Sequence, residues 1–235
     1  MIDDIEKIMT ELAKAGNRII VNPKTLEELK QHGIPLDNIP APSIEELFEK
    51  RKQSALLKLQ QLPTLPLGLQ PDIQALYQEI RECIFFDLNG AAITMSAILI
   101  EFVLKRVTFI KECGGYQAVD LIKLDEFENM ELGPAINRAK SAGILDSKMA
   151  ERLHSFREII RNPYSHYNIK KITENIVAEK VKQVNMETGE IKEIDIAAKD
   201  SPMIQAQVKP FMDEYHVMTV FGFADEVVKY LLNKI

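Results

Sequence analysis

The stretch from Gly90 to Lys111 constrains the fold most strongly, because it is apolar on most sides of a predicted helix. Its polar positions fall close to one narrow stripe: Thr94, Glu101, Lys105 and Thr108. A helix that is apolar nearly all round must be surrounded by other elements, so we expect it to be the central helix of a bundle. Its longest apolar run, residues 90–100, is too short to cross a bilayer. We therefore expect no membrane association.

Apolar residues at helical spacing predict further helices before and after this one. The spacing predicts helices over 72–86, 133–142, 146–160, 203–214 and 216–233, with Pro210 interrupting the fourth of these. Residues 178–198 alternate polar and apolar side chains around Gly189, which predicts a β-hairpin with its turn at that glycine. The expected fold is an all-α, antiparallel bundle of four to five helices with an inserted β-hairpin.

The first seventy residues have a different character. Short helices are predicted over 3–15 and 24–31, and Ser43 with Glu46 forms a capping box for a helix through about Leu59. Three prolines and a glycine follow between Leu62 and Pro71, which is typical of a linker. We expect residues 1–70 to form a small, mainly helical appendage and residues 71–235 to form the bundle.

Composition and motifs exclude several classes of function. The 235 residues carry a net charge of −6, which argues against broad, non-specific coating of nucleic acid. The sequence lacks the phosphate-binding loop, the zinc-binding His-Glu-x-x-His motif and the Gly-x-Ser-x-Gly nucleophile elbow. Cys83 and Cys113 lack metal-ligand spacing and are expected to be reduced core thiols. We expect a cytoplasmic protein without a cofactor or metal, since the N-terminus also lacks a secretion signal.

The candidate site is Arg161-Asn162-Pro163-Tyr164-Ser165-His166, at the end of the amphipathic helix 146–160. Pro163 disfavours the helical conformation at Asn162, so the helix should bend or stop there. Arginine can clamp phosphate oxygens, and histidine can act as acid or base near neutral pH. Such a pair suits metal-free cleavage of RNA, although one pair is not a complete acid–base set. A two-fold dimer would supply the second pair.

The surroundings of this motif strengthen the hypothesis. Residues 151–171 concentrate positive charge in an acidic protein, through Arg152, Arg157, Arg161, Lys170 and Lys171 against Glu151 and Glu158. Tyr164 and Tyr167 flank His166 and could stack on unpaired bases. The candidate substrate-contacting residues are Tyr164, Ser165, Tyr167, Arg157 and Lys170.

A structural interpretation of the same residues stays open. Arg161 would then interact with the negative end of its own helix, and His166 would be a hydrogen-bonding residue of a loop. Tyr164 would pack under the bundle.

The motif resembles the Arg-x(4–6)-His motif of the HEPN superfamily, in which a polar residue, here Asn162, typically follows the arginine. The approach is similar too, with Leu145-Asp146, an amphipathic helix and Phe156-Arg157-Glu158, and Ala91 to Leu104 looks like the second bundle helix of bacterial HEPN-like proteins. The resemblance covers residues 72–233 without the hairpin. The chain departs from the minimal antitoxin-paired HEPN toxins at Asn168, where they carry a tyrosine.

This resemblance implies a dimer that places two Arg–His motifs in one cleft, and metal-independent endoribonuclease activity in toxin–antitoxin, phage-defence or stress systems. Arg161 would hold the phosphate, His166 would act in proton transfer or orient the 2′-hydroxyl, and Asn162 would position the pair. RNA, a second copy of the chain and an antitoxin or defence-system protein are the expected partners. The alternative hypothesis is a non-catalytic HEPN module that dimerises or binds a partner protein or nucleotide. In a third hypothesis, residues 1–70 form a regulatory cap over the site.

Overall fold

The computed structural model describes residues 43–66, 68–115, 120–184 and 191–234. The chain divides into two compact units, Met1–Lys50 and Arg51–Ile235. The larger unit is mainly helical and carries one antiparallel two-stranded hairpin, which confirms the expected mixture of elements. The predicted helices 3–15 and 24–31 lie outside the described residues. The division of the chain into an appendage over residues 1–70 and a bundle over residues 71–235 stays a prediction.

Among the described residues, two helices precede the central one. α3 (Ile44–Leu59) begins with the predicted capping box, because the Glu46 amide donates to Ser43 Oγ and the Ser43 amide donates to the Glu46 carboxylate. α4 (Pro71–Phe85) follows the proline-rich stretch and has its proline in the first turn, where a missing N–H does no harm. Its apolar face packs on α5 (Asn89–Cys113).

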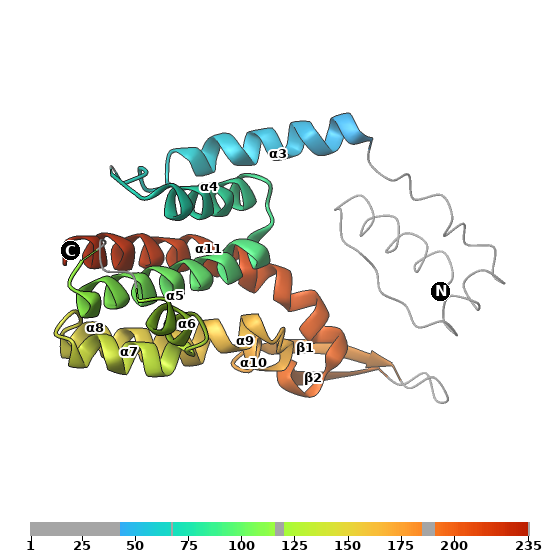
Figure 1. Ribbon diagram of the computed structural model, residues 1–235. Helices are drawn as coiled ribbons and strands as arrows, with labels where there is room; N and C mark the ends of the chain where they lie inside the picture. The colour runs from blue at the N-terminus through green and yellow to red at the C-terminus, as the bar shows by residue number, and fades with distance from the viewer. Residues whose placement is uncertain (1–42, 67, 116–119, 185–190, 235) are drawn as a thin grey trace. The chain divides into compact units, whose positions relative to one another are not determined.

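α5 is the centre of the bundle, as its all-round apolar character predicts. Its buried residues are Ala92, Ile93, Ser96, Ala97, Leu99, Ile100, Val103, Leu104, Val107, Thr108, Phe109 and Ile110. In Figure 1 α5 lies between the C-terminal helix α11 (Pro202–Leu232) and α7 (Leu132–Ser141), and it also packs against α4. Although it has 25 residues, neither it nor any other described helix is apolar enough over a sufficient length to cross a membrane.

A short helix, α6 (Leu121–Glu128), lies between α5 and α7, where the sequence analysis predicted no helix. Asp120 caps it by accepting from the amides of Ile122 and Lys123. Its Phe127 is buried against Phe109 of α5, with ring centroids 5.8 Å apart. α6 thereby closes one side of the groove beside the candidate site.

The helix that carries the candidate site continues past Asn162 but changes its hydrogen-bond pattern. α8 (Ser147–Phe156) passes into a π-helical turn, η2 (Arg157–Arg161), which continues into α9 (Asn162–Ser165). The expected break at Asn162 is wrong, because this residue has helical dihedral angles of −66° and −48°. The irregularity begins five residues earlier, and its wider turn accommodates Pro163, which cannot donate a backbone hydrogen bond.

The predicted hairpin is present. β1 (Val177–Val184) pairs antiparallel with β2 (Ile191–Ala197), with Val177 opposite Ala197 and Val184 opposite Ile191. The register shifts between Ala178 and Val181, where Lys180 has a left-handed backbone (φ 53°). The turn at Gly189 lies outside the described residues. The hairpin connects to the bundle through α10 (Ile169–Ile172) and the single turn η3 (Ala198–Asp200).

The two predicted C-terminal helices are one. α11 runs unbroken from Pro202 to Leu232 with Pro210 inside it, so the prediction of separate helices 203–214 and 216–233 is wrong. The helix bends between its ends (Figure 1), and proline is the usual cause of such a bend. Packing of its apolar face on α5 and a hydrogen bond of 2.6 Å from Tyr77 to Asp225 hold it against the bundle.

Candidate functional site

Arg161 is the last residue of the π turn, and an acidic residue of the central helix holds its guanidinium. Its Nε and Nη2 donate to Glu101 Oε2 at 3.3 and 3.1 Å. Its Nη1 donates to Asn162 Oδ1 at 3.3 Å. The side chain is 25% exposed, so it stays accessible to a ligand while its orientation is fixed from two sides.

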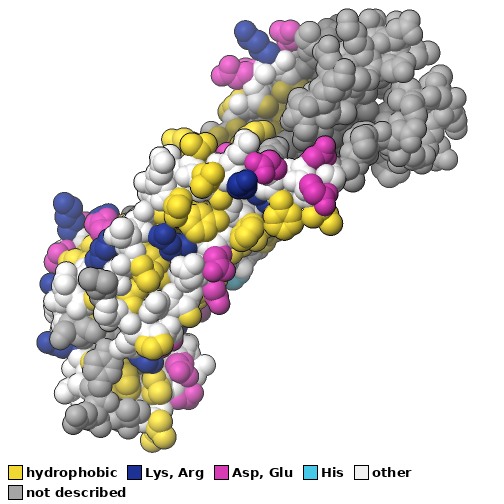
Figure 2. Space-filling model, turned by 90° about the horizontal axis from the view of Figure 1, so that it is seen from above, with side chains coloured by type: hydrophobic (Ala, Val, Ile, Leu, Met, Phe, Trp, Pro, Cys, Tyr) yellow, Lys and Arg dark blue, Asp and Glu magenta, His cyan; other side chains and the backbone are white. Residues whose placement is uncertain are grey.

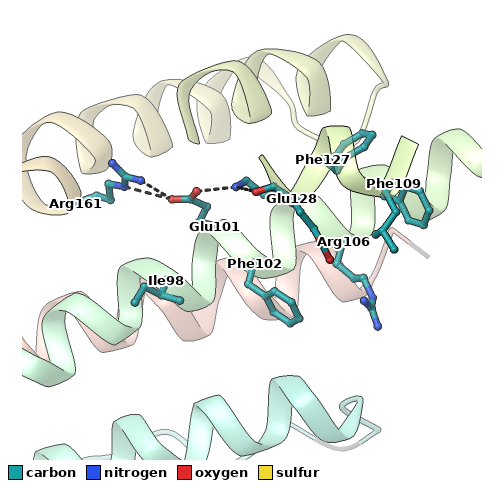
Figure 3. Close-up of a pocket in the computed structure, with 10 residues that line it drawn as sticks. Ile98, Glu101, Phe102, Arg106, Phe109, Phe127, Glu128 and Arg161 are labelled. Atoms are coloured by element: carbon teal, nitrogen blue, oxygen red, sulfur yellow. Dashed lines mark hydrogen bonds and ion pairs between the residues drawn. The ribbon is translucent and has the colours of Figure 1, made fainter. Parts of the chain in front are cut away.

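Glu101 joins Arg161 to a second cation. Lys105, one turn further along α5, reaches Glu101 Oε1 at 2.8 Å, so one carboxylate serves two cations. In Figure 3 the side chains of Arg161 and Glu101 point toward each other from the two helical segments. The three residues carry a net charge of +1, which leaves this cluster attractive to an anion.

A cavity of about 400 Å³ lies beside this ion-pair cluster. Its apolar wall comes from α5 and α6 and consists of Ile98, Phe102, Phe109, Leu124 and Phe127, most of which are seen in Figure 3. Its polar residues are Glu101, Lys105, Arg106, Glu128 and Arg161. Arg161 therefore sits at the edge of an apolar groove and not in open solvent.

His166 ends α9, and its side chain is exposed. Its backbone amide donates to Asn162 O at 3.2 Å, which fixes the turn by which the chain leaves the helix. Asn168 follows with a peptide hydrogen bond of 2.8 Å to Pro163 O. Hydrogen bonds therefore fix the backbone around His166, while the imidazole of His166 is exposed to a substrate from solution.

Tyr164, three residues after Arg161, is buried and has its hydrogen-bond partner on α11. Its hydroxyl donates to Asp213 Oδ1 at 2.8 Å, and Lys209 donates to the other oxygen of the same carboxylate at 2.5 Å. Burial and the hydrogen bond to Asp213 raise the pKa of Tyr164 well above its ordinary value. The part of the structural interpretation that concerns Tyr164 is confirmed, since the residue packs into the bundle core.

Tyr167 is on the same side but at the surface. It is 66% exposed and has a left-handed backbone (φ 49°), which is unusual for a bulky residue. The ammonium of Lys209 lies 5.0 Å from its ring centroid and 5.4 Å from that of Tyr164. These three residues line a second cavity of about 460 Å³ together with Gly90, Ala91, Thr94 and Met95 of α5.

The three other residues predicted to contact substrate are Arg157, Ser165 and Lys170. Arg157 packs over Gly133 of α7, where a Cβ atom would lie 2.0 Å from its Nη1, and it pairs with the adjacent Glu158. Ser165 and Lys170 are exposed on α9 and α10. The structure therefore pairs Arg161 with α5 and Tyr164 with α11, and His166 and Tyr167 follow directly after α9.

The positive charge that the sequence concentrates in residues 151–171 is largely compensated in space. Arg152 makes a two-point ion pair with Glu226 of α11, at 2.5 and 2.7 Å, and Arg161 pairs with Glu101. On the face shown in Figure 2, Lys and Arg side chains are likewise interspersed with Asp and Glu and with exposed hydrophobic side chains. The acidic partners of Arg152 and Arg161 therefore make the predicted basic patch weaker in space than in sequence.

Potential metal ligands are scattered in the part of the chain that the structure describes. Within those residues no three His, Cys, Asp or Glu side chains gather in a metal-binding group. Cys83 and Cys113 are free thiols, both half-buried, and burial raises the pKa of Cys83. His154 contacts Asn137 through Nε2 at 3.1 Å, which gives this histidine a structural partner.

The sequence did not indicate three further residues of the candidate site, which are Glu101, Lys209 and Asp213. Glu101 belongs to the narrow polar stripe of the otherwise apolar α5, and such a stripe signals a buried polar partner. Lys209 and Asp213 are spaced i, i+4, which is typical of an ion pair along a helix. The predicted interruption at Pro210 concealed that spacing, because it placed a helix break between them.

Comparison with known proteins finds no protein-family model that matches the chain, no similar protein of curated function and no similar solved structure.

Proposed function

We propose that this protein is a metal-independent endoribonuclease of HEPN type, with Arg161 and His166 as its catalytic residues. The observation that carries the proposal is the arginine beside the histidine-bearing turn: Glu101 and Asn162 orient it, it is partly exposed, and an exposed histidine follows five residues later. The proposal rests otherwise on the resemblance of residues 161–166 to the HEPN motif.

In the proposed reaction the ribose 2′-oxygen attacks the adjacent phosphorus and the bond from phosphorus to the 5′-oxygen breaks. A base takes the 2′-hydroxyl proton and an acid gives a proton to the leaving 5′-oxygen, so that a 2′,3′-cyclic phosphate and a 5′-hydroxyl result. Arg161 would donate to the phosphate oxygens as their negative charge increases. His166 would carry one of the two proton transfers.

A single His166 cannot act as base and acid in the same step, which is why the proposal includes a homodimer. In a two-fold dimer the same surface meets itself, so each Arg161–His166 pair could face its copy and complete the acid–base set. The exposed position of His166 at the end of α9 leaves room for such an approach. We further propose a role in bacterial defence, toxin–antitoxin function or stress response; neighbouring genes that encode an antitoxin or a defence subunit would support this role.

An RNA-cleavage assay in the presence of EDTA tests the proposal. The wild-type chain should cut single-stranded RNA and leave 2′,3′-cyclic phosphate ends, and His166→Ala should lose this activity. His154→Ala is the matched control, because it removes a histidine twelve positions upstream whose partner is Asn137. If neither the wild type nor any variant cleaves a varied panel of RNAs, the proposal is refuted.

A second candidate function is a non-catalytic interaction module. The observation in its favour is the apolar groove beside Arg161, with Ile98 of α5 and Leu121 and Ile122 of α6 exposed at its margin or nearby. Cross-linking separates the two candidates: in a chain with Cys83 and Cys113 replaced by alanine, His166→Cys should form a disulfide-linked dimer if two sites share one cleft. A dimer in which the two cysteines introduced at position 166 stay unlinked would favour the interaction module.

A further inference from the structure

The cavity of about 400 Å³ beside Arg161 has an apolar wall that the proposed cleavage does not use. Its volume lies within the range of pockets that take small organic ligands, and such pockets are mostly apolar with a few polar groups. Ile98 is 50% exposed, and Phe102 and Leu124 are half-buried, so apolar side chains line the cavity without filling it. A ligand would remove this apolar surface from water, so part of the ligand should itself be apolar.

The charged residues that line the cavity carry a net positive charge. Lys105, Arg106 and Arg161 supply three positive charges, and Glu101 and Glu128 supply two negative charges, which leaves a net charge of +1. A ligand with one negative charge would complete this balance, whereas a cationic ligand would be repelled. The polar part of the ligand should therefore be an anion.

Arg161 has hydrogen-bond donors to offer such an anion. A guanidinium carries five N–H donors. Within the described residues, three of these donors of Arg161 are engaged, two by Glu101 and one by Asn162. One N–H group on Nη1 and one on Nη2 remain, and arginine commonly binds a carboxylate through two parallel hydrogen bonds of this kind.

The other two cations of the cavity are less suited to hold the anion directly. Lys105 is 15% exposed and reaches Glu101 Oε1 at 2.8 Å and the carbonyl oxygen of Glu128 at 3.3 Å. Arg106 is paired with Asp72, with 3.4 Å between Nη2 and Oδ2. Both therefore add to the net charge, while the guanidinium held by Glu101 and Asn162 makes the direct contact.

The apolar wall continues from this guanidinium along the cavity. In Figure 3 Arg161 lies at one end of the row of lining residues and Arg106 near the other, with Ile98 and Phe102 between them. A ligand whose anion binds Arg161 would consequently have its apolar part against Ile98 and Phe102.

We propose that this cavity binds a small amphipathic anion, namely a carboxylate with a short apolar chain. The carboxylate binds Arg161, and the chain lies against Ile98 and Phe102. Ligand binding does not depend on RNA cleavage. Its consequence for cleavage rests on the proposed ribonuclease function: the ligand and the scissile phosphate require the same guanidinium, so the ligand is an inhibitor.

Isothermal titration calorimetry of the full-length chain with octanoate and with octan-1-ol near neutral pH tests the inference. The two probes have the same chain length and differ in the charge of the head group. We expect octanoate to bind at least about tenfold more tightly, as hydrogen bonds to a charged group imply. Hexanoate lacks two methylene groups and should bind about tenfold more weakly than octanoate.

Arg161→Gln and Ile98→Gln remove the two parts of the site separately. Arg161→Gln should weaken octanoate binding by about tenfold or more and abolish the preference over octan-1-ol. Ile98→Gln should weaken binding of both probes by about fivefold. Both variants should fold, because Glu101 keeps Lys105 as its partner and Ile98 is half exposed, and thermal unfolding checks this.

Arg152→Gln and Leu121→Gln are the matched controls. Arg152 is another arginine with an acidic partner, Glu226, and it belongs to α8. Leu121 is 73% exposed on α6 and lies outside the residues that line this cavity. Both variants should bind octanoate as the wild type does.

Absence of octanoate binding, equal affinity for octan-1-ol, or an octanoate affinity that survives Arg161→Gln would overturn the inference. These titrations contain no RNA, so each result would leave the proposed ribonuclease intact, and the first would leave the cavity to the partner protein of the interaction module. Conversely, octanoate binding that depends on Arg161 and Ile98 in a wild-type chain without cleavage activity would refute the ribonuclease and retain the ligand site. If the wild type does cleave RNA, cleavage that saturating octanoate leaves unchanged would overturn the assignment of the carboxylate to Arg161.

Discussion

Tyr164→Phe tests the hydrogen-bonded trio beneath the candidate site. The change removes only the hydroxyl that donates to Asp213 at 2.8 Å, and the phenyl ring still fills its place in the core. Asp213 is 8% exposed, so water cannot readily replace the lost donor, although Lys209 remains. A buried hydrogen bond to a charged group contributes about 1.5–3 kcal/mol, so we expect a loss of about 2 kcal/mol in the free energy of unfolding.

Thermal and urea unfolding would measure this loss. For a chain of this size, about 2 kcal/mol corresponds to a fall in Tm of about 4–8 °C and, with a slope of about 2 kcal/mol per molar, to about 1 M in the urea midpoint. Tyr215→Phe is the control, since its ring is mostly in solvent and its change should stay within about 0.5 kcal/mol. If Tyr164→Phe is as stable as this control, the trio does not hold the site to α11 as described.

Three other changes follow from the same contacts. Glu101→Gln removes the charge that compensates Arg161. Because both side chains are partly exposed, the substitution should lower the free energy of unfolding by less than about 1 kcal/mol. It should also increase the salt dependence of RNA affinity by about one phosphate contact, which fluorescence anisotropy at several salt concentrations would measure. Burial and hydrogen bonds to aspartates raise the pKa of Tyr77 and Tyr164. Above about pH 10 the unfolded chain therefore releases protons that the folded chain keeps, and its free energy of unfolding should fall by about 1.4 kcal/mol per pH unit for each tyrosine. Urea unfolding at several pH values measures this fall, and a flat profile would contradict it. Gly90→Ala would place a Cβ atom 2.8 Å from the carboxylate of Asp213, and calorimetry should show a loss of about 1–3 kcal/mol; an unchanged Tm would mean that the buried pair can move aside.

Periodicity alone predicted the bundle well. The central helix, its two flanking partners α4 and α7, and the hairpin lie within a few residues of their expected positions, because each has an unambiguous apolar pattern. The capping box at Ser43 is local chemistry and is formed as predicted. The continuous α11 was not predicted, since packing along its whole length outweighs the local preference of Pro210 to end a helix.

The site was harder to predict, because its contacts are remote in sequence. Arg161 and His166 were proposed from their own motif. Glu101, sixty positions before Arg161, and Asp213, forty-nine after Tyr164, become neighbours only when α5 and α11 pack against the motif. The expected basic patch was not accurate for the same reason, since Arg152 pairs with Glu226, which is seventy-four positions away in the sequence.

The π turn at Arg157–Arg161 sets a rotational phase for everything that follows it. If the same residues formed a regular α-helix instead, the segment that follows would be rotated by about 100° about the helix axis, because a π turn takes up about one residue more than an α turn. Arg161 and Tyr164 would then both lose their partners, one on α5 and the other on α11. The wider turn thus directs Arg161 toward its partner on α5 and Tyr164 toward its partner on α11, whereas exposed residues of the same turn, such as Ile159, do not depend on this phase.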